Sequence, residues 1–214
     1  MKLFYTTARP FERLKVLEDN HEVIAAEVPP FDTNAITIKR LHKDWHNTGE
    51  KEAWLEFVAK LESNRAWIGG WDEQAWFNFP LVIGGKAVGA AKELCPTTVK
   101  LLKGIEGVNV AGFALLLPRS QLPVHTDTTG YHYNSAAFNM LLSGSNSTLH
   151  VGPEDTHDHK KGVAVIFNSE YPHSARNNGD SNRVILYLDF VLKLGQTTPL
   201  PVKEGGSENP RVEV

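Results

Sequence analysis

The spacing of apolar residues in the first half of the chain is typical of helices. Residues 10–27 repeat apolar positions every three or four residues and stop before a Pro-Pro pair, which predicts a first helix. The same spacing predicts a second helix over about 50–63 and a third over about 86–103, in which Pro96 must start or kink a turn. We interpret these helices as a scaffold.

Extended segments punctuate this helical half. Residues 1–8 predict a short strand or arm, and Ile36 with Ile38 indicates a possible brief strand. Residues 66–83 are rich in tryptophan and phenylalanine, and the part from Gln74 to Ile83 predicts a strand. Aromatic side chains at this density usually close a core against a sheet, although one of them lining a pocket is the alternative.

From Val108 onward the pattern changes to short apolar and β-branched runs between turn residues. Five such runs predict strands, over 110–117, 135–142, 148–151, 162–168 and 183–192. Five or more short strands favour an antiparallel sandwich or barrel with the helical half packed on its outer face. We therefore expect a mainly β fold with flanking helices. The prediction is one domain over 1–194, with a helical scaffold over 10–103, a β core over 108–192 and a flexible tail over 195–214.

Composition excludes several functional classes. The chain has 214 residues, of which 41% are hydrophobic and 22% charged, and a net charge of −3, which favours neither nucleic acid nor an anionic membrane as a partner. Neither a signal peptide nor an apolar stretch of membrane-spanning length is evident, so we expect a cytoplasmic protein. The one cysteine, Cys95, excludes an internal disulfide, and we interpret it as a buried thiol because no paired base lies nearby.

Candidate chemistry concentrates between His125 and Arg183. His125, Asp127 and His173 supply two imidazoles and a carboxylate, the ligand set of a facial-triad Fe(II) site. Asp127 follows His125 by two positions, so an extended backbone would place both side chains on one face. Arg183 begins the last predicted strand, and its planar guanidinium suits one carboxylate of a dicarboxylate.

Other polar residues have weaker functional interpretations. The His157–His159 segment has a zinc-like composition but lies among charged residues, so we predict a solvated loop. His132 and Tyr133 could line a pocket mouth or an exposed connection. His150 could face a cavity, and we interpret Arg119 as surface charge.

The larger frame resembles a known family. The resemblance is carried by Leu17–Ile24, with His21 where the family has tryptophan, and by Ala75–Leu81, Cys95–Thr98, Gly162–Asn168, Pro172–Ala175 and Arg183–Asp189. These motifs, covering about 10–190, are similar to those of the aspartyl/asparaginyl β-hydroxylases. This family of 2-oxoglutarate-dependent Fe(II) dioxygenases includes bacterial L-proline cis-hydroxylases.

The resemblance implies a double-stranded β-helix, or jelly roll, with iron between its sheets. It implies that His125 and His173 bind the metal and that Arg183 grips the C5 carboxylate of 2-oxoglutarate. Asp127 matches the proline-hydroxylating members, whereas the animal enzymes have glycine there. Asn139 stands where the family usually has a second histidine that contacts the cosubstrate, and an amide can still donate a hydrogen bond to a carboxylate.

The function implied is hydroxylation of an amino acid, free or as an Asp, Asn or Pro residue in a peptide or protein. Fe(II), 2-oxoglutarate and O2 are the implied cofactors, with succinate and CO2 as products. A small intracellular substrate fits better than a secreted domain. Two alternatives stay open: a cupin-like metal enzyme that does not use 2-oxoglutarate, and a non-catalytic jelly-roll binding or sensor protein. The oligomeric state is not predicted.

Overall fold

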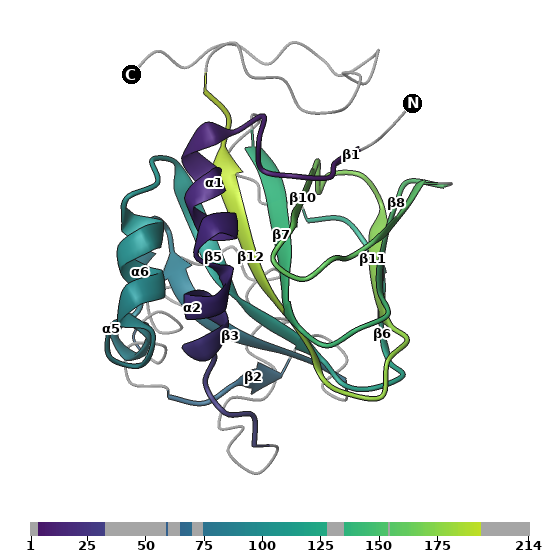
Figure 1. Cartoon of the computed structure of the whole chain (residues 1–214), viewed down its shortest axis with the longest axis horizontal. Helices are drawn as coiled ribbons and strands as arrows, with labels where there is room; N and C mark the ends of the chain where they lie inside the picture. The colour runs from purple at the N-terminus through teal and green to yellow at the C-terminus, as the bar shows by residue number, and fades with distance from the viewer. Residues whose placement is uncertain are drawn as a thin grey trace.

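The computed structural model describes residues 4–32, 59, 65–69, 75–127, 135–153 and 155–193 (Figure 1). The predicted brief strand near Ile36, the helix over 50–63 apart from Ala59, and the tail over 195–214 lie outside the described residues. The expectations for His132 and Tyr133 also fall outside them.

Two antiparallel sheets form the body of the protein. The larger has the order β1-β10-β7-β12-β5-β3-β2, with β4 paired to β3, and the smaller has the order β6-β11-β8-β9. The strands of the larger sheet are β1 (Phe4–Tyr5), β10 (Ala164–Phe167), β7 (Ser135–Ser143), β12 (Arg183–Val191), β5 (Val108–Leu116), β3 (Trp76–Ile83), β2 (Ile68–Gly69) and β4 (Lys86–Ala87). Those of the smaller sheet are β6 (Gln121–His125), β11 (His173–Asn177), β8 (Ser147–Val151) and β9 (Asp155–Asp158). The mainly β, jelly-roll prediction is confirmed.

The helices cover the face of the larger sheet that points away from the smaller one (Figure 1). They are α1 (Glu12–Asp19), α2 (His21–Ala26), α5 (Gly89–Leu94) and α6 (Pro96–Lys103). The predicted helix over 10–27 is therefore two helices, broken at Asn20, whose side-chain amide donates to the Val16 carbonyl at 2.8 Å. A side chain that bonds to the backbone in this way competes with helical continuation.

The predicted helix over 86–103 was also wrong as a single element. Its first residues form β4, and the remainder splits into α5 and α6 at Cys95. Pro96 begins α6, where its missing N–H is not needed for an intrahelical bond. Cys95 itself is fully buried, and burial, aided by the nearby Glu27 charge, raises the pKa of its thiol to about 12. The buried-thiol prediction is confirmed.

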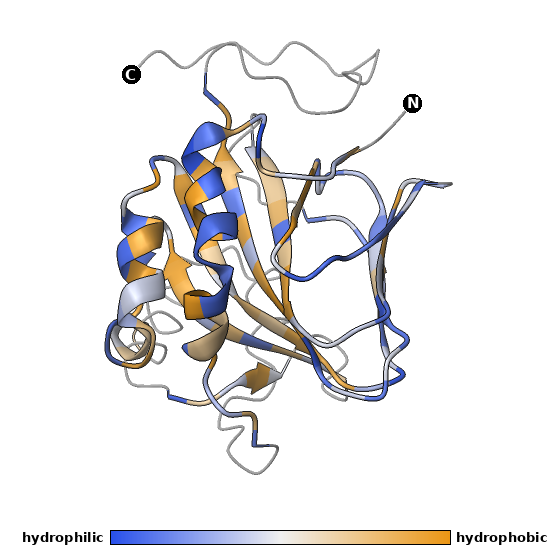
Figure 2. Ribbon diagram, viewed as in Figure 1, coloured by the Kyte–Doolittle hydropathy of each residue, from blue (hydrophilic) through white to orange (hydrophobic). Residues whose placement is uncertain are grey.

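Strand β12 shows how the larger sheet separates two environments. Val184, Leu186, Leu188 and Phe190 join the main apolar core, which also contains residues of the covering helices. The intervening positions, including Arg183, face the smaller sheet, because successive strand side chains point to opposite faces. Figure 2 shows the same division, with apolar residues beneath the helices and more polar residues on the smaller sheet.

The aromatic segment before β3 contributes mainly to the core. Trp67 is 2% exposed, and its ring lies 5.9 Å from the ring of Phe79. Trp76 is only partly buried, and Trp71 lies outside the described residues. The core interpretation is therefore confirmed for Trp67.

Three strands of the smaller sheet were missed by the sequence analysis. Strands β6, β9 and β11 have polar or exposed alternate positions, so they lack the apolar runs used to predict strands. The predicted solvated loop at His157–His159 was wrong for His157 and Asp158, which lie in β9. No helix among the described segments is both long and apolar enough to span a bilayer.

The Glu18 carboxylate on α1 links the helical layer to the larger sheet. Glu18 accepts hydrogen bonds from the backbone N–H of Ala164 at 2.8 Å and of Ala8 at 3.2 Å. Ala164 is the first residue of β10, the strand that precedes the turn to His173. The motif that resembles the family at Leu17–Ile24 thus has a structural role in this chain.

Candidate metal centre

Antiparallel pairing of β6 and β11 brings the two predicted histidines together. His125 ends β6, His173 begins β11, and the two residues are direct partners in the register. Their imidazole rings lie 4.2 Å apart between centroids. Cross-strand partners on one face are close neighbours, so this register alone is enough to juxtapose residues distant in sequence.

Both imidazoles are oriented by backbone carbonyls. Nδ1 of His125 lies 2.7 Å from the carbonyl oxygen of Pro123, and Nδ1 of His173 lies 2.9 Å from that of Tyr171. A carbonyl can only accept, so Nδ1 carries the proton in each neutral ring. The Nε2 lone pairs are then the ones that could ligate a metal, and a second partner usually fixes a histidine ligand in this way.

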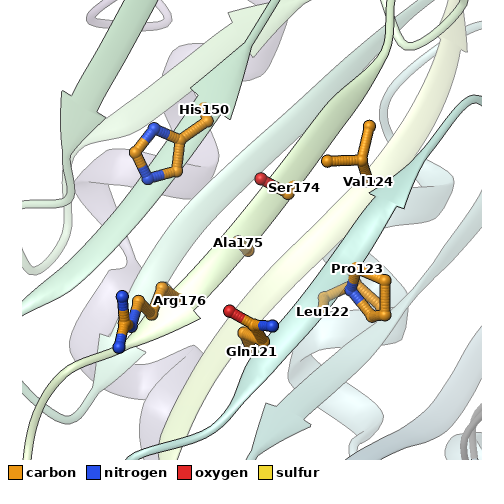
Figure 3. A pocket seen from close by; sticks show the side chains of 8 residues that line it. All are labelled: Gln121, Leu122, Pro123, Val124, His150, Ser174, Ala175 and Arg176. Carbon is orange, nitrogen blue, oxygen red and sulfur yellow. The ribbon is translucent and has the colours of Figure 1, made fainter.

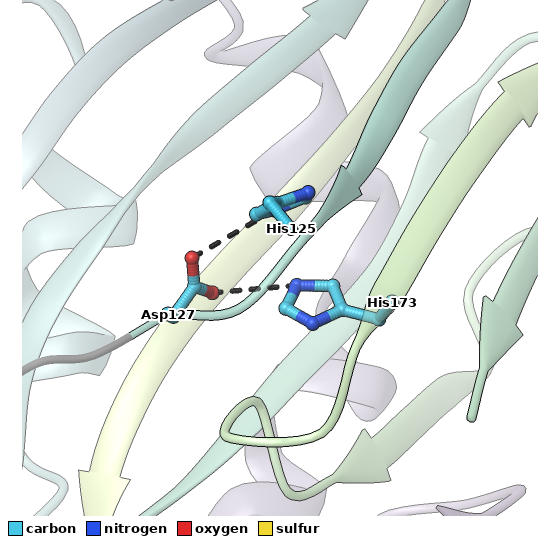
Figure 4. Close-up of side chains that lie close together, drawn as sticks. All are labelled: His125, Asp127 and His173. Atoms are coloured by element: carbon cyan, nitrogen blue, oxygen red, sulfur yellow. Dashed lines mark ion pairs between the residues drawn. The ribbon is translucent and has the colours of Figure 1, made fainter.

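Asp127 completes the cluster from the segment after β6. Its backbone N–H donates to the carbonyl of Ser169 at 2.9 Å, which holds it against the turn that precedes β11. Its two oxygens lie 3.7 Å from Nε2 of His125 and 3.5 Å from Nε2 of His173 (Figure 4). One ligand atom from each of the three residues lies within 4.8 Å of the others, so the structure brings this predicted triad together.

The donor set fits a divalent non-haem metal. Two neutral imidazoles and one carboxylate from a single side form the facial arrangement that leaves further coordination positions open. The two imidazole side chains are 9% and 6% exposed, whereas Asp127 is 38% exposed. The cluster therefore has a buried side and an accessible side, as a site that admits ligands requires.

The pKa values of the two histidines are shifted in opposite directions. Burial, with the neighbouring imidazole, lowers the pKa of His125 despite the Pro123 carbonyl and Asp127. For His173, burial also acts to lower the pKa, but Asp127 and the Tyr171 carbonyl outweigh it and raise the pKa. The lowered pKa of His125 favours the neutral form that a metal ligand needs.

A second carboxylate faces this interior and received no separate role in the sequence analysis. Asp189 lies on β12, and burial together with the Asp127 charge raises its pKa to about 7. Tyr187, two residues earlier, is on the same face, and burial likewise raises the pKa of its hydroxyl. The signal was present in the sequence: polar residues at alternate positions of an otherwise apolar strand mark an inward-facing polar stripe.

Arg183 is buried on the same face of β12. It is 2% exposed, and its Nε donates to Oγ of Ser147 at 2.8 Å. Its Nη2 atom has no hydrogen-bond partner in the described part of the chain, and none of the acidic residues described there forms an ion pair with it. Burial lowers the pKa of the guanidinium to about 10. A buried cation without an acidic partner is costly unless an anion binds beside it.

Asn139 lies on β7, directly across from Tyr187 of β12 and Val165 of β10 in the register. Its side chain alternates with residues of the helix-facing core, which places it on the interior face. The predicted role of Asn139 in binding the cosubstrate stays a prediction.

The remaining histidines occupy two different faces of the smaller sheet. His150 is exposed, and its Nδ1 lies 3.1 Å from Oγ1 of Thr156, so it does not face the interior. The solvated-loop prediction for His157–His159 was wrong, because β9 turns His159 inward and leaves it 8% exposed. Arg119 is a surface charge, as predicted, paired with Asp180 at 2.6 Å.

A shallow hollow of about 150 Å³ lies on the outer face of the smaller sheet (Figure 3). Exposed residues of three neighbouring strands surround it, including Val124, His150 and Arg176. The side chains of the candidate metal ligands point to the opposite face, so this hollow is separate from the candidate metal centre.

Sequence comparison finds a similar curated protein. The chain is 31% identical over 104 residues to the ornithine lipid ester-linked acyl 2-hydroxylase of Rhizobium tropici, a match that covers 47% of this chain and 36% of that relative. The chain thus spans about a third of the length of the curated relative that it matches.

Among the solved structures to which this chain is similar is an oxidoreductase of the 2OG-Fe(II) oxygenase family from Burkholderia pseudomallei. It is 11% identical, with 64% of this chain and 77% of that chain covered at a TM-score of 0.39. A predicted oxalate decarboxylase from Thermotoga maritima is 17% identical, with 55% and 81% covered at a TM-score of 0.37. Residues 18–192 match the family model described as aspartyl/asparaginyl beta-hydroxylase. Because this match spans most of the sequence and contains every residue of the metal centre, the chain belongs to the aspartyl/asparaginyl β-hydroxylase family.

Proposed function

We propose that the protein is a hydroxylase that uses Fe(II), 2-oxoglutarate and O2, and releases succinate and CO2. The observation that carries the proposal is the combination of the His125–Asp127–His173 cluster with a buried, unneutralised Arg183 facing the same interior. Family membership supports the hydroxylase class, and the buried arginine supports a dicarboxylate cosubstrate.

The charges of the site balance those of the proposed ligands. Two neutral histidines and the Asp127 carboxylate would hold a divalent iron and leave one net positive charge at the metal. Arg183 supplies a second positive charge farther along the interior. A dicarboxylate carries two negative charges, so it would neutralise both ends of the pocket.

Each protein group has a defined task in this proposal. His125, Asp127 and His173 would hold the metal, and the carbonyls of Pro123 and Tyr171 keep the imidazoles turned toward it. Bound iron with its cosubstrate and O2 supplies the oxidative chemistry itself.

Positioning and exclusion of water fall to the neighbouring side chains. Arg183 would fix the far end of the cosubstrate, so that its 2-oxo acid end is presented in one orientation. The Phe167 ring packs edge-on against His173 with the centroids 5.1 Å apart, and it keeps that side of the site apolar.

The substrate proposal follows the family. We propose an amino acid, free or as an Asp, Asn or Pro residue of a peptide, as the acceptor of the hydroxyl group. The similarity to an acyl 2-hydroxylase acting on an ornithine lipid favours a second candidate, an ester-linked acyl chain. A panel containing free amino acids, peptides and an acylated ornithine distinguishes these classes by succinate release.

The first experiment titrates metal-free protein anaerobically with Fe(II) and then with 2-oxoglutarate. We expect a visible metal-to-ligand charge-transfer band in the native protein. His173→Ala removes a ligand and should abolish the band, whereas His150→Ala, at an exposed histidine of the same sheet, should leave it unchanged.

Arg183→Met tests the cosubstrate class separately. It should weaken 2-oxoglutarate binding without preventing metal binding, and Arg176→Met is the control at an exposed arginine. Stoichiometric iron binding with no band in the native protein would overturn the proposal and favour a cupin-like enzyme or a sensor. An Arg183→Met protein with native affinity for 2-oxoglutarate would also contradict it.

A further inference from the structure

A second polar cluster lies between the sheets, at the other end of the β8–β11 pair from the metal centre. It consists of Arg183, Ser147 and His159, which are 2%, 1% and 8% exposed. Nε of Arg183 donates to Oγ of Ser147 at 2.8 Å, and this oxygen lies 3.1 Å from Nδ1 of His159. The backbone N–H of His159 also donates to the Ser147 carbonyl at 2.8 Å, which ties the end of β9 to β8. We call these three residues the Arg183 cluster.

Hydrogen-bond direction within the Arg183 cluster assigns its protons. A guanidinium only donates, so Oγ of Ser147 accepts from Arg183 and its own proton is free to donate to Nδ1 of His159. The imidazole then carries its proton on Nε2. Burial, followed by the neighbouring Arg183 charge, lowers the pKa of His159 well below its usual range, although the Ser147 backbone opposes this. The ring is therefore neutral and presents one N–H group.

Two polar atoms of the cluster are left over. Nη2 of Arg183 and Nε2 of His159 are both buried without a hydrogen-bond partner among the described residues. Buried donors in folded proteins are normally satisfied, and an unsatisfied one is costly. A permanent cation and a neutral N–H donor, joined through one hydroxyl, match the two oxygens of a carboxylate.

Asn139 lies farther along the interior than the Arg183 cluster, toward the candidate metal centre. It pairs with Tyr187, which is two residues from Asp189 and four from Arg183 along β12. Asn139 is thus nearer to the metal end than to the Arg183 cluster. His159 is the second donor that the fold places beside Arg183.

We propose that His159 donates its Nε2–H to the far carboxylate of the 2-oxo dicarboxylate cosubstrate, next to Arg183, with Ser147 orienting both groups. This inference rests on the proposed function and adds a second cosubstrate-binding side chain to it. His159, which was predicted to lie in a solvated loop, would then help to select the cosubstrate.

The length of the interior agrees with this assignment. Val151 pairs with His173 at the metal centre, and Ser147 pairs with Asn177 at the Arg183 cluster. Four residues of strand span about 13 Å. A five-carbon dicarboxylate spans about 7 Å between its terminal oxygens, and a metal bond of about 2 Å with a hydrogen bond of about 3 Å brings the total to about 12 Å.

The test compares two substitutions that each keep one nitrogen position of the imidazole. His159→Asn keeps a polar group near the Nδ1 position, which faces Ser147, but removes the donor at Nε2. His159→Gln keeps a donor near the Nε2 position. His157→Asn is the matched control, because this neighbouring ring packs edge-on against Phe4 and is not bonded to Ser147 or Arg183.

Affinity is measured on iron-loaded protein, anaerobically, for 2-oxoglutarate and for 2-oxobutyrate, which lacks the far carboxylate. We expect His159→Asn to weaken 2-oxoglutarate binding about 10- to 100-fold, the effect of one hydrogen bond to a charged group. Binding of 2-oxobutyrate should change less than about twofold, since it makes no contact there. His159→Gln should recover most of the lost affinity, and His157→Asn should resemble the native protein.

The ratio of the two affinities within each variant cancels any loss of folded or metal-binding protein. An unchanged ratio in His159→Asn, in a native protein that binds 2-oxoglutarate, would overturn the role of His159 and leave the proposed function intact. If His159→Asn lowered the affinity for both oxo acids equally, the effect would be one of packing and the role would be overturned. The same conclusion would follow if His157→Asn lowered the affinity ratio as much as His159→Asn. Native protein that binds iron but neither oxo acid would instead refute the proposed function itself. Ser147→Ala is the second variant, and the inference requires that it too lower the ratio.

Discussion

Replacing Arg183 by methionine should make the metal-free, ligand-free protein more stable while weakening its cosubstrate binding. The guanidinium is buried and donates a hydrogen bond to Ser147, and none of the described acidic residues forms an ion pair with it. Methionine has a similar length, fills irregular space and carries no charge. The substitution therefore removes the burial of an unneutralised cation and keeps most of the packing.

The expected change in the free energy of unfolding follows from the pKa of Arg183. Burial lowers the pKa of Arg183 from 12.5 to about 10. That difference corresponds to about 3 kcal/mol of destabilisation of the charged form. Loss of the hydrogen bond from this charged group to Ser147 costs about 1.5–2 kcal/mol. We expect the free energy of unfolding to rise by about 1 kcal/mol.

The pH range of this effect is fixed by the sign of the shift. Because the folded pKa is the lower one, the destabilisation is fully present below about pH 10 and fades only as pH rises toward 12.5. Urea unfolding of the metal-free protein at neutral pH measures it, provided that the slope of the transition is unchanged. The exposed Arg176→Met control should shift stability by less than about 0.5 kcal/mol. A methionine variant less stable than the native protein by about 2 kcal/mol or more would show that the cation is well compensated, and would refute the reasoning.

Three further predictions concern the scaffold. Cys95, with a thiol pKa of about 12, should react with iodoacetamide at pH 8 at least about 1,000-fold more slowly in native than in urea-unfolded protein; similar rates would contradict its burial. Burial acts to raise the pKa of Glu27, but hydrogen bonds from Thr97 and Thr98 outweigh it and lower the pKa. Because Glu27 is only partly buried, solvent screens these bonds, and Glu27→Gln should cost about 0.5–1 kcal/mol near neutral pH. The difference should vanish as pH falls through the folded pKa, and a pH-independent difference would refute the capping role. Gly162→Ala combines a φ of +73° with a Cβ only 2.6 Å from the His21 ring, so it should cost about 2–4 kcal/mol, and His21→Ala in the same protein should recover only the steric part.

The sequence determined the elements whose apolar pattern is strong. The five predicted strands of the second half all exist, because runs of apolar and β-branched residues bury on a sheet in any arrangement. The candidate metal ligands were also visible, since few residue types can hold a metal and the motif fixes their order. Helix ends were less certain. Asn20 and Pro96 interrupt spacing that otherwise continues, and local hydrogen bonding decides such breaks.

Only the tertiary structure decided which polar residues share an interior. Strands β6, β9 and β11 carry few apolar residues, and their pairing comes from register with neighbours rather than from their own pattern. That register sets His125 against His173 and brings His159 within hydrogen-bonding distance of Ser147, which also bonds to Arg183. In a strand, a shift of one residue would reverse each side chain to the other face. Residue type and spacing therefore indicated the candidate chemistry, whereas long-range pairing decided which polar residues lie together.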